Sequence, residues 1–333
     1  MILLTGGLGF IGSHMAALLI EKGETFVIVD NLSNARIEVL SALEKMAGRQ
    51  LLFVKADIRD PIAINDIFCQ YPISSVIHFA GLKSVNESIK KPIFYYDVNV
   101  AGTISLVQIM QQHQVFDMVF SSSAAIYGTP EQLPIVESSA KKPNTAYGET
   151  KWICEQFLAS VVQSDSRWRV VNLRYFNPIG AHPSGLIGEN PLGVPMNLMP
   201  YLAQVVAKQR ECLSVFGGDY PTPDGTCIRD YLHVMDLVKG HWSALKYLLC
   251  QPQGLNLALN LGRGYGISIL EFISAFEKVT GQRVPFQIVE RRQGDTSVLY
   301  ASAKQAEQLL NWQAQLDMTE MCRSAWYFMQ HSG

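Results

Sequence analysis

"LLTGGLGFIGSH", residues 3–14, joins a short apolar run to a helical pattern through a glycine-rich turn. Glycines at Gly6, Gly9 and Gly12 give the spacing G-x-x-G-x-x-G. Gly6 permits a tight turn, Gly9 lets the backbone approach a pyrophosphate, and Gly12 allows close packing of helix on strand. Amides at the start of the helix add a partial positive charge. A strand, turn and helix in this order predict a dinucleotide site.

Two acidic residues extend this predicted site. Asp30 ends the second apolar run, "VIVDN", 18 positions after Gly12. A carboxylate there can accept a hydrogen bond from the adenosine ribose 2′-hydroxyl and repels a 2′-phosphate, so the sequence favours NAD over NADP. Asp57, in "KADIRD" after the third run, is placed where it could bond the adenine amino group.

Short apolar runs alternate with helical patterns through the first half of the chain. This alternation predicts an α/β fold, a Rossmann-type doubly wound parallel sheet covered by helices on both faces. The region 177–226 is rich in Pro and Gly and indicates a second, smaller domain of mixed α/β structure. We expect residues 1–176 and about 234–262 to form the NAD-binding domain, and residues 177–233 and 263–333 to form the substrate domain.

The expected strands are Ile2–Thr5, Phe26–Val29, Leu52–Lys55, Ser75–Phe79, Met118–Ser121 and Val170–Leu173, and "NLALNLG" is a seventh strand-like run. The expected helices are Ile11–Lys22, Ile37–Met46, Ile62–Gln70, Val98–His113, Tyr147–Gln163 and one near Pro200–Lys208, with a further helix over "HVMDLVKGHWSALKYL".

Composition excludes several classes of function. The 333 residues carry a formal net charge of −2, so no global positive field is present to hold nucleic acid or an anionic membrane. The six cysteines form no C-x-x-C pair and none lies near a histidine at zinc-ligand spacing, which predicts a reducing compartment and no metal. The apolar N-terminal run stops at Thr5 without a cationic region, so we expect a soluble, cytoplasmic protein.

A hydroxyl, a phenol and an ammonium group follow the fifth predicted strand. "FSSSAAIYG", residues 120–128, places Ser123 at the carboxyl end of that strand, where parallel sheets bind ligands. "YGETK" places Tyr147 and Lys151 one helical turn apart on one face. The Y-x-x-x-K spacing alone also fits an exposed helix start. Beside a nicotinamide ring, Lys⁺ and the ring would favour phenolate, and lowering the tyrosine pKa from about 10 by roughly three units would make Tyr147 a usable base.

Longer strings resemble a known family. The fingerprint TGGxGFIG, the serine run with Y-x-x-x-K, and "NVAGT" with Asn99 resemble the extended short-chain dehydrogenase/reductase superfamily. "VIHFAGLKSVNESIKKPIFYYDVNVAGT", "LRYFNPIGAHPSGLIGENP" and "FGGDYPTPDGTCIRDYLHVMDL" are similar to the UDP-glucose (UDP-galactose) 4-epimerases. The similarity runs from residue 1 to near the C-terminus.

This resemblance implies epimerisation at C4 of UDP-glucose or UDP-galactose through a transient 4-keto sugar, with tightly bound NAD and a homodimer built on the helices over 98–113 and 147–163. Tyr147 would exchange the proton of the 4-hydroxyl, Ser123 would bond the 4-oxygen and help move that proton, and Lys151 would bond the nicotinamide ribose. The remaining cofactor-binding residues implied are Phe10, Ile11, Asn31, Ile58, Phe79, Ala80, Lys83, Asn99 and Tyr175. The substrate-binding residues implied are Ser123, Asn177, Asn197, Leu198, Arg229, Arg292, Asp295 and Leu299, with both arginines on the diphosphate.

Leu299 departs from the family pattern. Members specialised for glucose and galactose commonly have a tyrosine there, against the sugar. Leucine is smaller and has no hydroxyl, so our hypothesis is a pocket that also admits UDP-N-acetylglucosamine and UDP-N-acetylgalactosamine, with UDP-N-acetylglucosamine 4-epimerase as the alternative main activity. The adjacent Tyr300 leaves the opposite outcome open, because a small register shift could return a ring to the pocket.

Other classes remain as alternatives. A 4,6-dehydratase of the same superfamily has an Asp-Glu pair just after the strand-end hydroxyl, whereas this chain has Ala124 and Ala125, which cannot transfer protons. A decarboxylase of UDP-glucuronate would need cationic or hydroxyl groups at a carboxylate, and the sequence shows no sign of them. A non-catalytic NAD-sensing protein typically loses the tyrosine or the lysine, and both are present.

Overall fold

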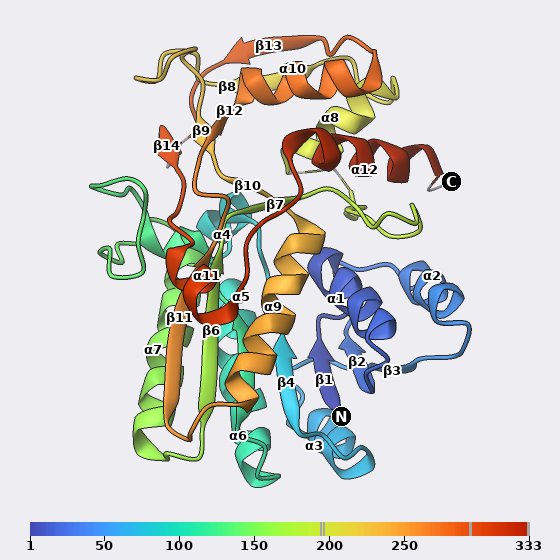
Figure 1. The fold of residues 1–333 in the computed structure, drawn as a ribbon, viewed down its shortest axis with the longest axis vertical. Helices are drawn as coiled ribbons and strands as arrows, with labels where there is room; N and C mark the ends of the chain where they lie inside the picture. Colours follow the sequence, from blue (N-terminus) through green and yellow to red (C-terminus); the bar gives the residue numbers. More distant parts are fainter. Residues whose placement is uncertain (194, 196, 293–294, 332–333) are drawn as a thin grey trace.

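A parallel sheet of seven strands forms the centre of the computed structural model, which describes residues 1–193, 195, 197–292 and 295–331 (Figure 1). The strand order is β11-β6-β5-β4-β1-β2-β3. Four of the strands are buried along their whole length, because helices cover both faces of the sheet. The strands are β1 (Ile2–Thr5), β2 (Phe26–Asp30), β3 (Leu52–Lys55), β4 (Ser75–His78), β5 (Asp117–Ser121), β6 (Arg169–Tyr175) and β11 (Leu255–Leu261).

Neighbouring side chains of β1 point into two separate cores. Leu4 packs with the helices on one face and Leu3 with those on the other, as the alternation of a strand requires. The first face carries α1 (Phe10–Glu21), α2 (Glu38–Ala47), α9 (Val234–Leu249) and α11 (Lys304–Leu310). The second face carries α3 (Pro61–Gln70), α6 (Gly102–Gln112) and α7 (Ala146–Ser164).

The connection between β4 and α6 is helical but irregular. It contains α4 (Val85–Lys90), α5 (Pro92–Tyr95) and a π-helical segment over Tyr96–Ala101. The helix predicted to begin at Val98 therefore begins inside this π-helical segment and becomes regular at Gly102. Side chains bond to its backbone: the Asn99 carbonyl oxygen accepts from Thr103 Oγ1 at 2.6 Å and from Cys154 Sγ at 3.3 Å. Single π turns of this kind are frequent at functional sites.

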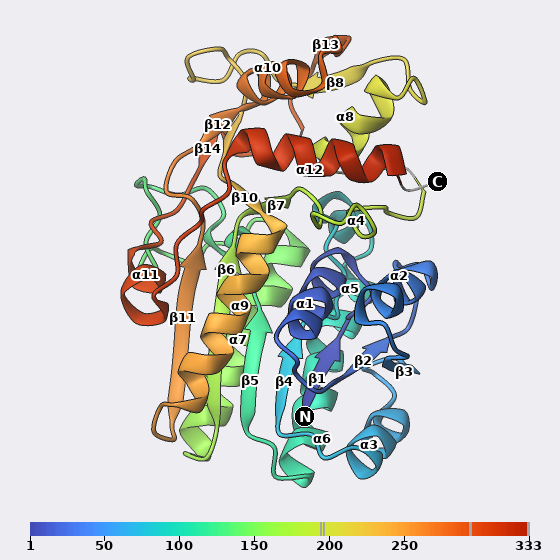
Figure 2. The same cartoon turned by 45° about the vertical axis from the view of Figure 1, so that its right-hand side comes forward.

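A smaller α/β region lies beyond the carboxyl ends of the sheet strands (Figures 1 and 2). Its helices pack around a core of its own that includes Leu202, Phe272, Phe276 and Met321. Its strands are β7 (Asn177–Ile179) beside β10 (Tyr231–His233), β9 (Ile228–Arg229) between β12 (Ile267–Ser268) and β14 (Val298–Leu299), and β8 (Leu213–Phe216) beside β13 (Phe286–Val289). Its helices are α8 (Leu198–Val206), α10 (Ile269–Thr280) and α12 (Met318–His331).

The predicted fold class is confirmed, and the expected strands and helices occur with shifts of a few residues at their ends. β11 pairs with β6, and α9 packs against α1, so both segments return to the large sheet. The division into two domains at residues 177, 234 and 263 stays a proposal. No helix in the described ranges combines the length and the apolar character needed to cross a membrane.

Candidate functional site

The order of the strands reverses between β1 and β4. Such a reversal creates a crevice at the carboxyl ends of the strands. At the start of the crevice, Gly6 has a φ of +66°, and a Cβ on it would lie 2.6 Å from the Ala80 amide nitrogen. A Cβ on Gly12 would lie 2.1 Å from the Gly6 carbonyl oxygen. The two glycines therefore have the tight-turn and close-packing roles that their spacing predicts.

The first turn of α1 has no side-chain cap. Gly9 occupies the N-cap position and cannot supply a side-chain acceptor for the free amides at the helix start, where Phe10 and Ile11 are the first residues. Asp30 holds the turn from the side, because its carboxylate accepts from the Leu8 amide at 3.1 Å and from the Leu32 amide at 2.9 Å. Burial raises the pKa of Asp30. An uncapped helix start beside a carboxylate fits the phosphates and ribose of a dinucleotide.

Asp57 is held by protein donors. Its carboxylate pairs with the Arg59 guanidinium at 2.8 Å and accepts from Asn31 Nδ2 at 2.8 Å. These hydrogen bonds, the one from Arg59 first, hold its pKa below the usual range. Arg59 also pairs with Asp97 at 2.5 Å, which ties the loop after β3 to the π-helical segment. The buried Ile58 lies between Asp57 and Arg59 in the sequence. The predicted adenine side of the site is therefore held by the ion pairs of Arg59 with Asp57 and Asp97, which the sequence reasoning missed.

The loop after β4 forms the opposite wall of the crevice. The Phe79 amide donates to the Thr5 carbonyl oxygen at 3.1 Å, and its ring lies 4.7 Å from the His241 ring. Ala80 lies directly against Gly6. Lys83 Nζ reaches across to the smaller region and pairs with Glu189 at 2.9 Å. Lys83 is thus near the crevice, and Glu189 is a partner that the sequence reasoning missed.

Asn99 connects the loop after β4 to α7 through its side chain. Its buried side-chain amide donates to the Leu82 carbonyl oxygen at 3.1 Å and to Thr150 Oγ1 at 3.0 Å. Its side-chain oxygen accepts from the Leu82 amide at 2.7 Å. The side chain therefore fixes the loop after β4 to α7. The cofactor contact implied for Asn99 would have to use side-chain atoms that already bond to Leu82 and Thr150.

Ser123, Tyr147 and Lys151 come together in the interior at the end of β5, each at most 8% exposed. The Ser123 hydroxyl lies close enough to the Tyr147 phenol to lower its pKa, and Lys151 Nζ donates to the Ser121 carbonyl oxygen at 2.8 Å. Tyr175 joins them, because its hydroxyl lies 2.6 Å from Ser121 Oγ. The predicted catalytic residues therefore share one buried site with one predicted cofactor residue.

The lowering of the Tyr147 pKa that is expected beside a nicotinamide ring stays a prediction, because the protein groups by themselves act in the other direction. Burial raises the pKa of Tyr147, and the hydrogen bond from Ser123 offsets only part of that rise. Burial also lowers the pKa of Lys151 to about 8. The physical reason is that Lys151 directs its ammonium group to the Ser121 carbonyl oxygen, so desolvation outweighs the attraction between the lysine and a phenolate.

Three predicted substrate residues lie together at the β9-β14 strand pair: Arg229 on β9, Leu299 on β14, and Asp295 in the segment before β14. Arg229 Nη2 lies 3.5 Å from Asp295 Oδ1, and Leu299 pairs in register with Arg229. Leu299 packs against the small core that contains Ala124 and Ile126, the residues just after Ser123. Leu299 therefore connects the Arg229–Asp295 pair to the catalytic turn.

The remaining predicted substrate residues make separate contacts. The Arg292 guanidinium carbon lies 3.7 Å from the centre of the Phe216 ring. Asn197, at the N-cap of α8, donates from Nδ2 to Glu189 Oε1 at 2.5 Å, and Leu198 begins the helix. The Asn177 amide donates to the Asp230 carbonyl oxygen at 3.0 Å. Phe216 and Glu189 lie inside strings that carry the family resemblance, but neither was singled out as a site residue from the sequence.

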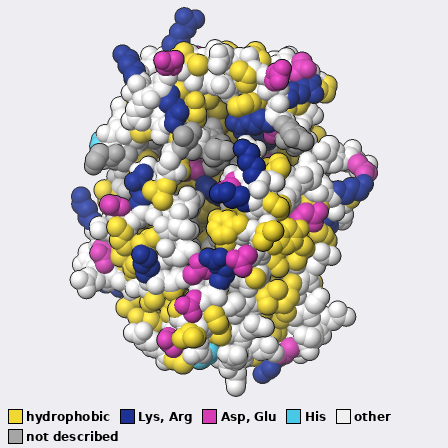
Figure 3. Space-filling model, turned by 180° about the vertical axis from the view of Figure 1, so that it is seen from behind, with side chains coloured by type: hydrophobic (Ala, Val, Ile, Leu, Met, Phe, Trp, Pro, Cys, Tyr) yellow, Lys and Arg dark blue, Asp and Glu magenta, His cyan; other side chains and the backbone are white. Residues whose placement is uncertain are grey.

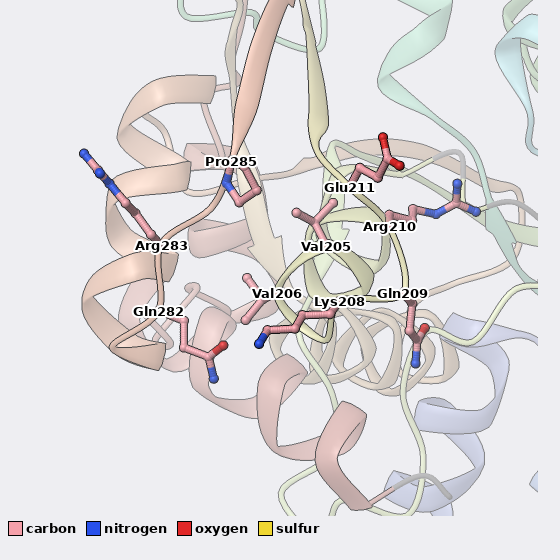
Figure 4. A pocket seen from close by; sticks show the side chains of 9 residues that line it. All are labelled: Val205, Val206, Lys208, Gln209, Arg210, Glu211, Gln282, Arg283 and Pro285. Atoms are coloured by element: carbon pink, nitrogen blue, oxygen red, sulfur yellow. The ribbon is translucent and has the colours of Figure 1, made fainter.

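A surface hollow of about 620 Å³ lies away from these residues (Figure 4). It is open, and none of the predicted site residues lines it. Its lining comes from the end of α8 and from the segment before β13, and comprises Val205, Val206, Lys208, Gln209, Arg210, Glu211, Gln282, Arg283 and Pro285. Among the described residues, no group of three or more His, Cys, Asp or Glu could hold a metal ion.

Known proteins of similar sequence and structure point to one class. A family model described as GDP-mannose 4,6 dehydratase matches residues 3–325. UDP-glucose 4-epimerase 2 of Arabidopsis thaliana is 47% identical over 331 residues, which cover 98% of this chain and 93% of that protein.

Two solved structures superpose on nearly the whole chain. UDP-glucose-4-epimerase from Stenotrophomonas maltophila, with bound NAD and formylated UDP-arabinopyranose, has a TM-score of 0.96 at 46% identity and covers 99% of this chain and 98% of its own. UDP-glucose 4-epimerase from Bifidobacterium longum, in complex with NAD+ and UDP, has a TM-score of 0.95 at 43% identity, with coverage of 99% and 98%.

Proposed function

The chain belongs to the UDP-glucose 4-epimerase family, and we propose that Tyr147, Ser123 and Lys151 perform the reaction of that family at the end of β5. The protein is an NAD-dependent enzyme that inverts C4 of a UDP-hexose, UDP-glucose or UDP-galactose. The observation that supports the residue roles is the buried arrangement of one hydroxyl, one phenol and one ammonium group beside the crevice.

Each of these side chains has a distinct task. Tyr147 removes the proton of the sugar 4-hydroxyl and later returns it, and Ser123, whose hydroxyl lies beside the phenol, bridges the proton to the sugar oxygen. Lys151 supplies positive charge next to the phenol, and burial of all three excludes water. Bound NAD would supply the acceptor and donor for the hydride of C4. The uncapped start of α1, Asp30 and the two close-packed glycines hold that cofactor.

The substrate is held from the smaller region. Arg229 and Arg292 both lie near Asp295 and offer guanidinium groups for the two phosphates, and Asp295 lies beside Arg229 for the ribose of uridine. These roles rest on the family resemblance and on the position of Arg229 next to Leu299.

A dehydratase activity is disfavoured, although the matching family model carries a dehydratase description. Elimination of water needs an acid next to the strand-end hydroxyl. The residues there are Ala124 and Ala125, and Ala124 is buried at 3% exposure, so no ionisable side chain follows Ser123. The similar known proteins are epimerases with 47–48% sequence identity to this chain, which agrees with the absence of an ionisable side chain after Ser123.

Tyr147→Phe tests the assignment. It removes one hydroxyl from a buried ring, so the fold and the bound NAD should persist while turnover of UDP-galactose falls by at least roughly 10²- to 10⁴-fold. The matched control is Tyr265→Phe, which removes a hydroxyl from an exposed ring and should leave turnover unchanged. Near-normal turnover in Tyr147→Phe would overturn the role of this residue.

We further propose a homodimer in which the helices on the second face of the sheet contact a partner subunit. Figure 3 shows this back face, where apolar side chains gather over the middle and lower part of the molecule. Its exposed apolar residues include Ile89, Ile93, Phe94 and Tyr96 from α4, α5 and the π-helical segment, with Ile93 at 85% exposure. Ile93→Glu should shift sedimentation toward a monomer, whereas Ile37→Glu at the start of α2, on the first face and 45% exposed, should not. A monomeric wild-type protein at micromolar concentration would contradict the dimer.

We also keep a cytoplasmic location as a proposal. All six cysteines are free, as expected for a reducing compartment.

A further inference from the structure

Arg174 on β6 and Glu155 on α7 form an ion pair inside the protein, and each side chain is 5% exposed. Arg174 Nη2 donates to Glu155 Oε2 at 2.6 Å, and Nε donates to both carboxylate oxygens at 3.0 and 3.2 Å. Removing two charges from water is costly, and their attraction offsets the cost only with complete hydrogen bonding. Such a pair is therefore weak evidence for stability, and its place in the molecule needs another explanation.

The pair holds both ends of the turn that carries Ser123. Before this turn, Ser122 Oγ donates to Glu155 Oε1 at 2.5 Å. After it, Arg174 Nη1 donates to the Tyr127 hydroxyl at 3.0 Å. Ser123 lies between Ser122 and Tyr127 in the sequence. Because Glu155 belongs to the same helix as Tyr147, the pair fixes the Ser123 turn to the helix that presents Tyr147.

The hydrogen bonds of the pair continue to two further segments. Arg174 Nη1 also donates to the Glu137 carbonyl oxygen at 3.0 Å. The Tyr127 hydroxyl donates to Asn260 Oδ1 at 2.7 Å, and the Asn260 amide donates to Glu137 Oε1 at 2.9 Å. The network thus joins α7, β6, β11 and the segment before α7. A substitution at one of its residues therefore alters the hydrogen bonds of the others.

Glu155 also lies on the same face of α7 as the catalytic residues. Tyr147, Lys151 and Glu155 follow one another at intervals of four, which spans roughly 12 Å of helix. The carboxylate of Glu155 favours the charged form of Lys151 and so opposes the burial that lowers the lysine pKa to about 8. The other groups that face Lys151 are the Cys154 thiol, the His78 ring on β4, the Phe120 ring and the Ser121 carbonyl oxygen.

We propose that Glu155 and Arg174 are positioning residues of the epimerisation, whose ion pair keeps the Ser123 turn aligned with Tyr147 across β5 and α7. This inference rests on the proposed roles of Ser123 and Tyr147. Neither charged side chain bonds to either catalytic hydroxyl; both act through Ser122 and Tyr127. A second consequence is that the negative charge of Glu155 keeps Lys151 protonated through the neutral range.

Glu155→Gln is the direct test, because the amide keeps the shape of the carboxylate and removes its charge. We expect kcat for UDP-galactose to fall by roughly 10- to 100-fold, since a small misplacement of reacting groups has effects of this size. KM should stay within about twofold, because Arg229 and Arg292 are untouched, and bound NAD should be retained. The alkaline limb of the pH profile of kcat should move to lower pH.

The matched control is an ion pair at the other end of β6. Arg169 Nε on β6 pairs with Asp117 Oδ1 on β5 at 2.7 Å, away from the carboxyl ends of the strands. Asp117→Asn breaks this ion pair and should lower the thermal midpoint while kcat and its pH profile stay unchanged. Ser122→Ala is the milder companion variant: it leaves the ion pair in place and removes the bond from Ser122 to Glu155, so kcat should fall by several-fold.

A readout that needs no turnover is the pH dependence of the thermal midpoint. The folded protein releases the Lys151 proton at about pH 8, and an unfolded lysine does so at about 10.4, so the unfolded state binds more protons between these values. The Lys151 contribution to stability therefore rises with pH above about 8. In Glu155→Gln this rise should begin at lower pH, and in Asp117→Asn it should begin where it does in the wild type.

Two results would overturn the inference. One is a folded Glu155→Gln or Ser122→Ala that keeps kcat within twofold of the wild type. The other is an equal loss of kcat in Asp117→Asn with no movement of either pH profile, since the pair would then be an ordinary structural element. A wild-type protein inactive on UDP-galactose would instead refute the proposed function, and the thermal profiles would still decide whether Glu155 acts on Lys151.

Discussion

Lys151 Nζ donates a 2.8 Å hydrogen bond to the Ser121 carbonyl oxygen, which ties α7 to the end of β5 inside the catalytic site. Lys151→Met would keep the length of the side chain and remove both the charge and this bond. We expect kcat to fall by roughly 10²-fold or more, because the phenol of Tyr147 loses the adjacent positive charge and the Ser121 carbonyl loses its donor.

The measurement for Lys151→Met is kcat together with the amount of NAD bound per subunit. Lys45→Met on the exposed side of α2 removes an equal charge and should leave both unchanged. A Lys151→Met protein with more than half of the wild-type kcat would contradict the role of the lysine.

Gly12→Ala should weaken the cofactor site without touching a polar group. The added Cβ would lie 2.1 Å from the Gly6 carbonyl oxygen and 2.7 Å from the Gly7 Cα, both of them backbone atoms that must move. We expect a loss of about 1–3 kcal/mol in the free energy of unfolding from this overpacking. Because the turn itself shifts, the purified protein should also contain less NAD.

Gly48→Ala is the control for Gly12→Ala. Gly48 ends α2 at a φ of +63° with open space around it, so the alanine costs about 1–2 kcal/mol of backbone strain and no collision. Its NAD content should equal that of the wild type. Equal NAD contents in the two variants would show that the close packing of Gly12 is unimportant for the cofactor.

The glycine turn, Asp30 and the pair of Tyr147 with Lys151 could be predicted because each depends on local spacing. The turn has to follow a strand and open a helix, and two residues four apart on a helix share a face. The fold class followed from the alternation of apolar runs with helical periods. The main boundary error was at residues 96–101, where bonds from Thr103 and Cys154 to the Asn99 carbonyl accompany a π-helical turn that no sequence period marks.

The partners that connect distant segments could not be predicted. Arg174 bonds to Glu155, Tyr127 and Glu137. Glu189 pairs with Lys83 from another loop. Only tertiary packing places these residues together. One signal was present: Glu155 lies four positions after Lys151 on the same helical face. The effect of the protein groups on the Tyr147 pKa could not be predicted from the sequence either, since it depends on how deeply the phenol is buried.

Leu299→Tyr tests the width of the sugar pocket. Leu299 packs against the core that follows Ser123 and is paired with Arg229, so a tyrosine there would place a ring and a hydroxyl beside the sugar. If the leucine leaves room for an N-acetyl group, the variant should lose activity on UDP-N-acetylgalactosamine relative to UDP-galactose. A contact of about 1–3 kcal/mol corresponds to a change of roughly 10- to 200-fold in the ratio of kcat/KM values.

Val298→Tyr is the matched control for Leu299→Tyr, because neighbouring residues of a strand point to opposite faces. Its ratio of kcat/KM values should equal that of the wild type. An unchanged ratio in Leu299→Tyr would remove Leu299 from the determinants of specificity. A wild-type protein inactive on UDP-N-acetylgalactosamine would show that the pocket is narrow in spite of the leucine.

Four buried histidines should make the fold sensitive to acid. Burial lowers the pKa of His14 and His78 to about 3 and that of His233 and His241 to about 4. An unfolded histidine takes up its proton at about pH 6.5, so between about pH 4 and 6.5 the unfolded state binds more protons and stability falls as the pH falls. Asp230 acts in the opposite direction, because burial raises its pKa to about 6 and the folded state holds its proton first.

The histidines outnumber this aspartate, so the net expectation is an uptake of about three protons on unfolding at pH 5 and a loss of about 4 kcal/mol for each pH unit there. Urea unfolding at pH 7, 6 and 5 measures the change in free energy, and its slope against pH gives the proton count. His78→Gln should reduce the uptake by about one proton if it folds. An uptake near zero at pH 5 would mean that the buried rings are already protonated in the folded protein, and the assignment of neutral histidines in the interior would fail.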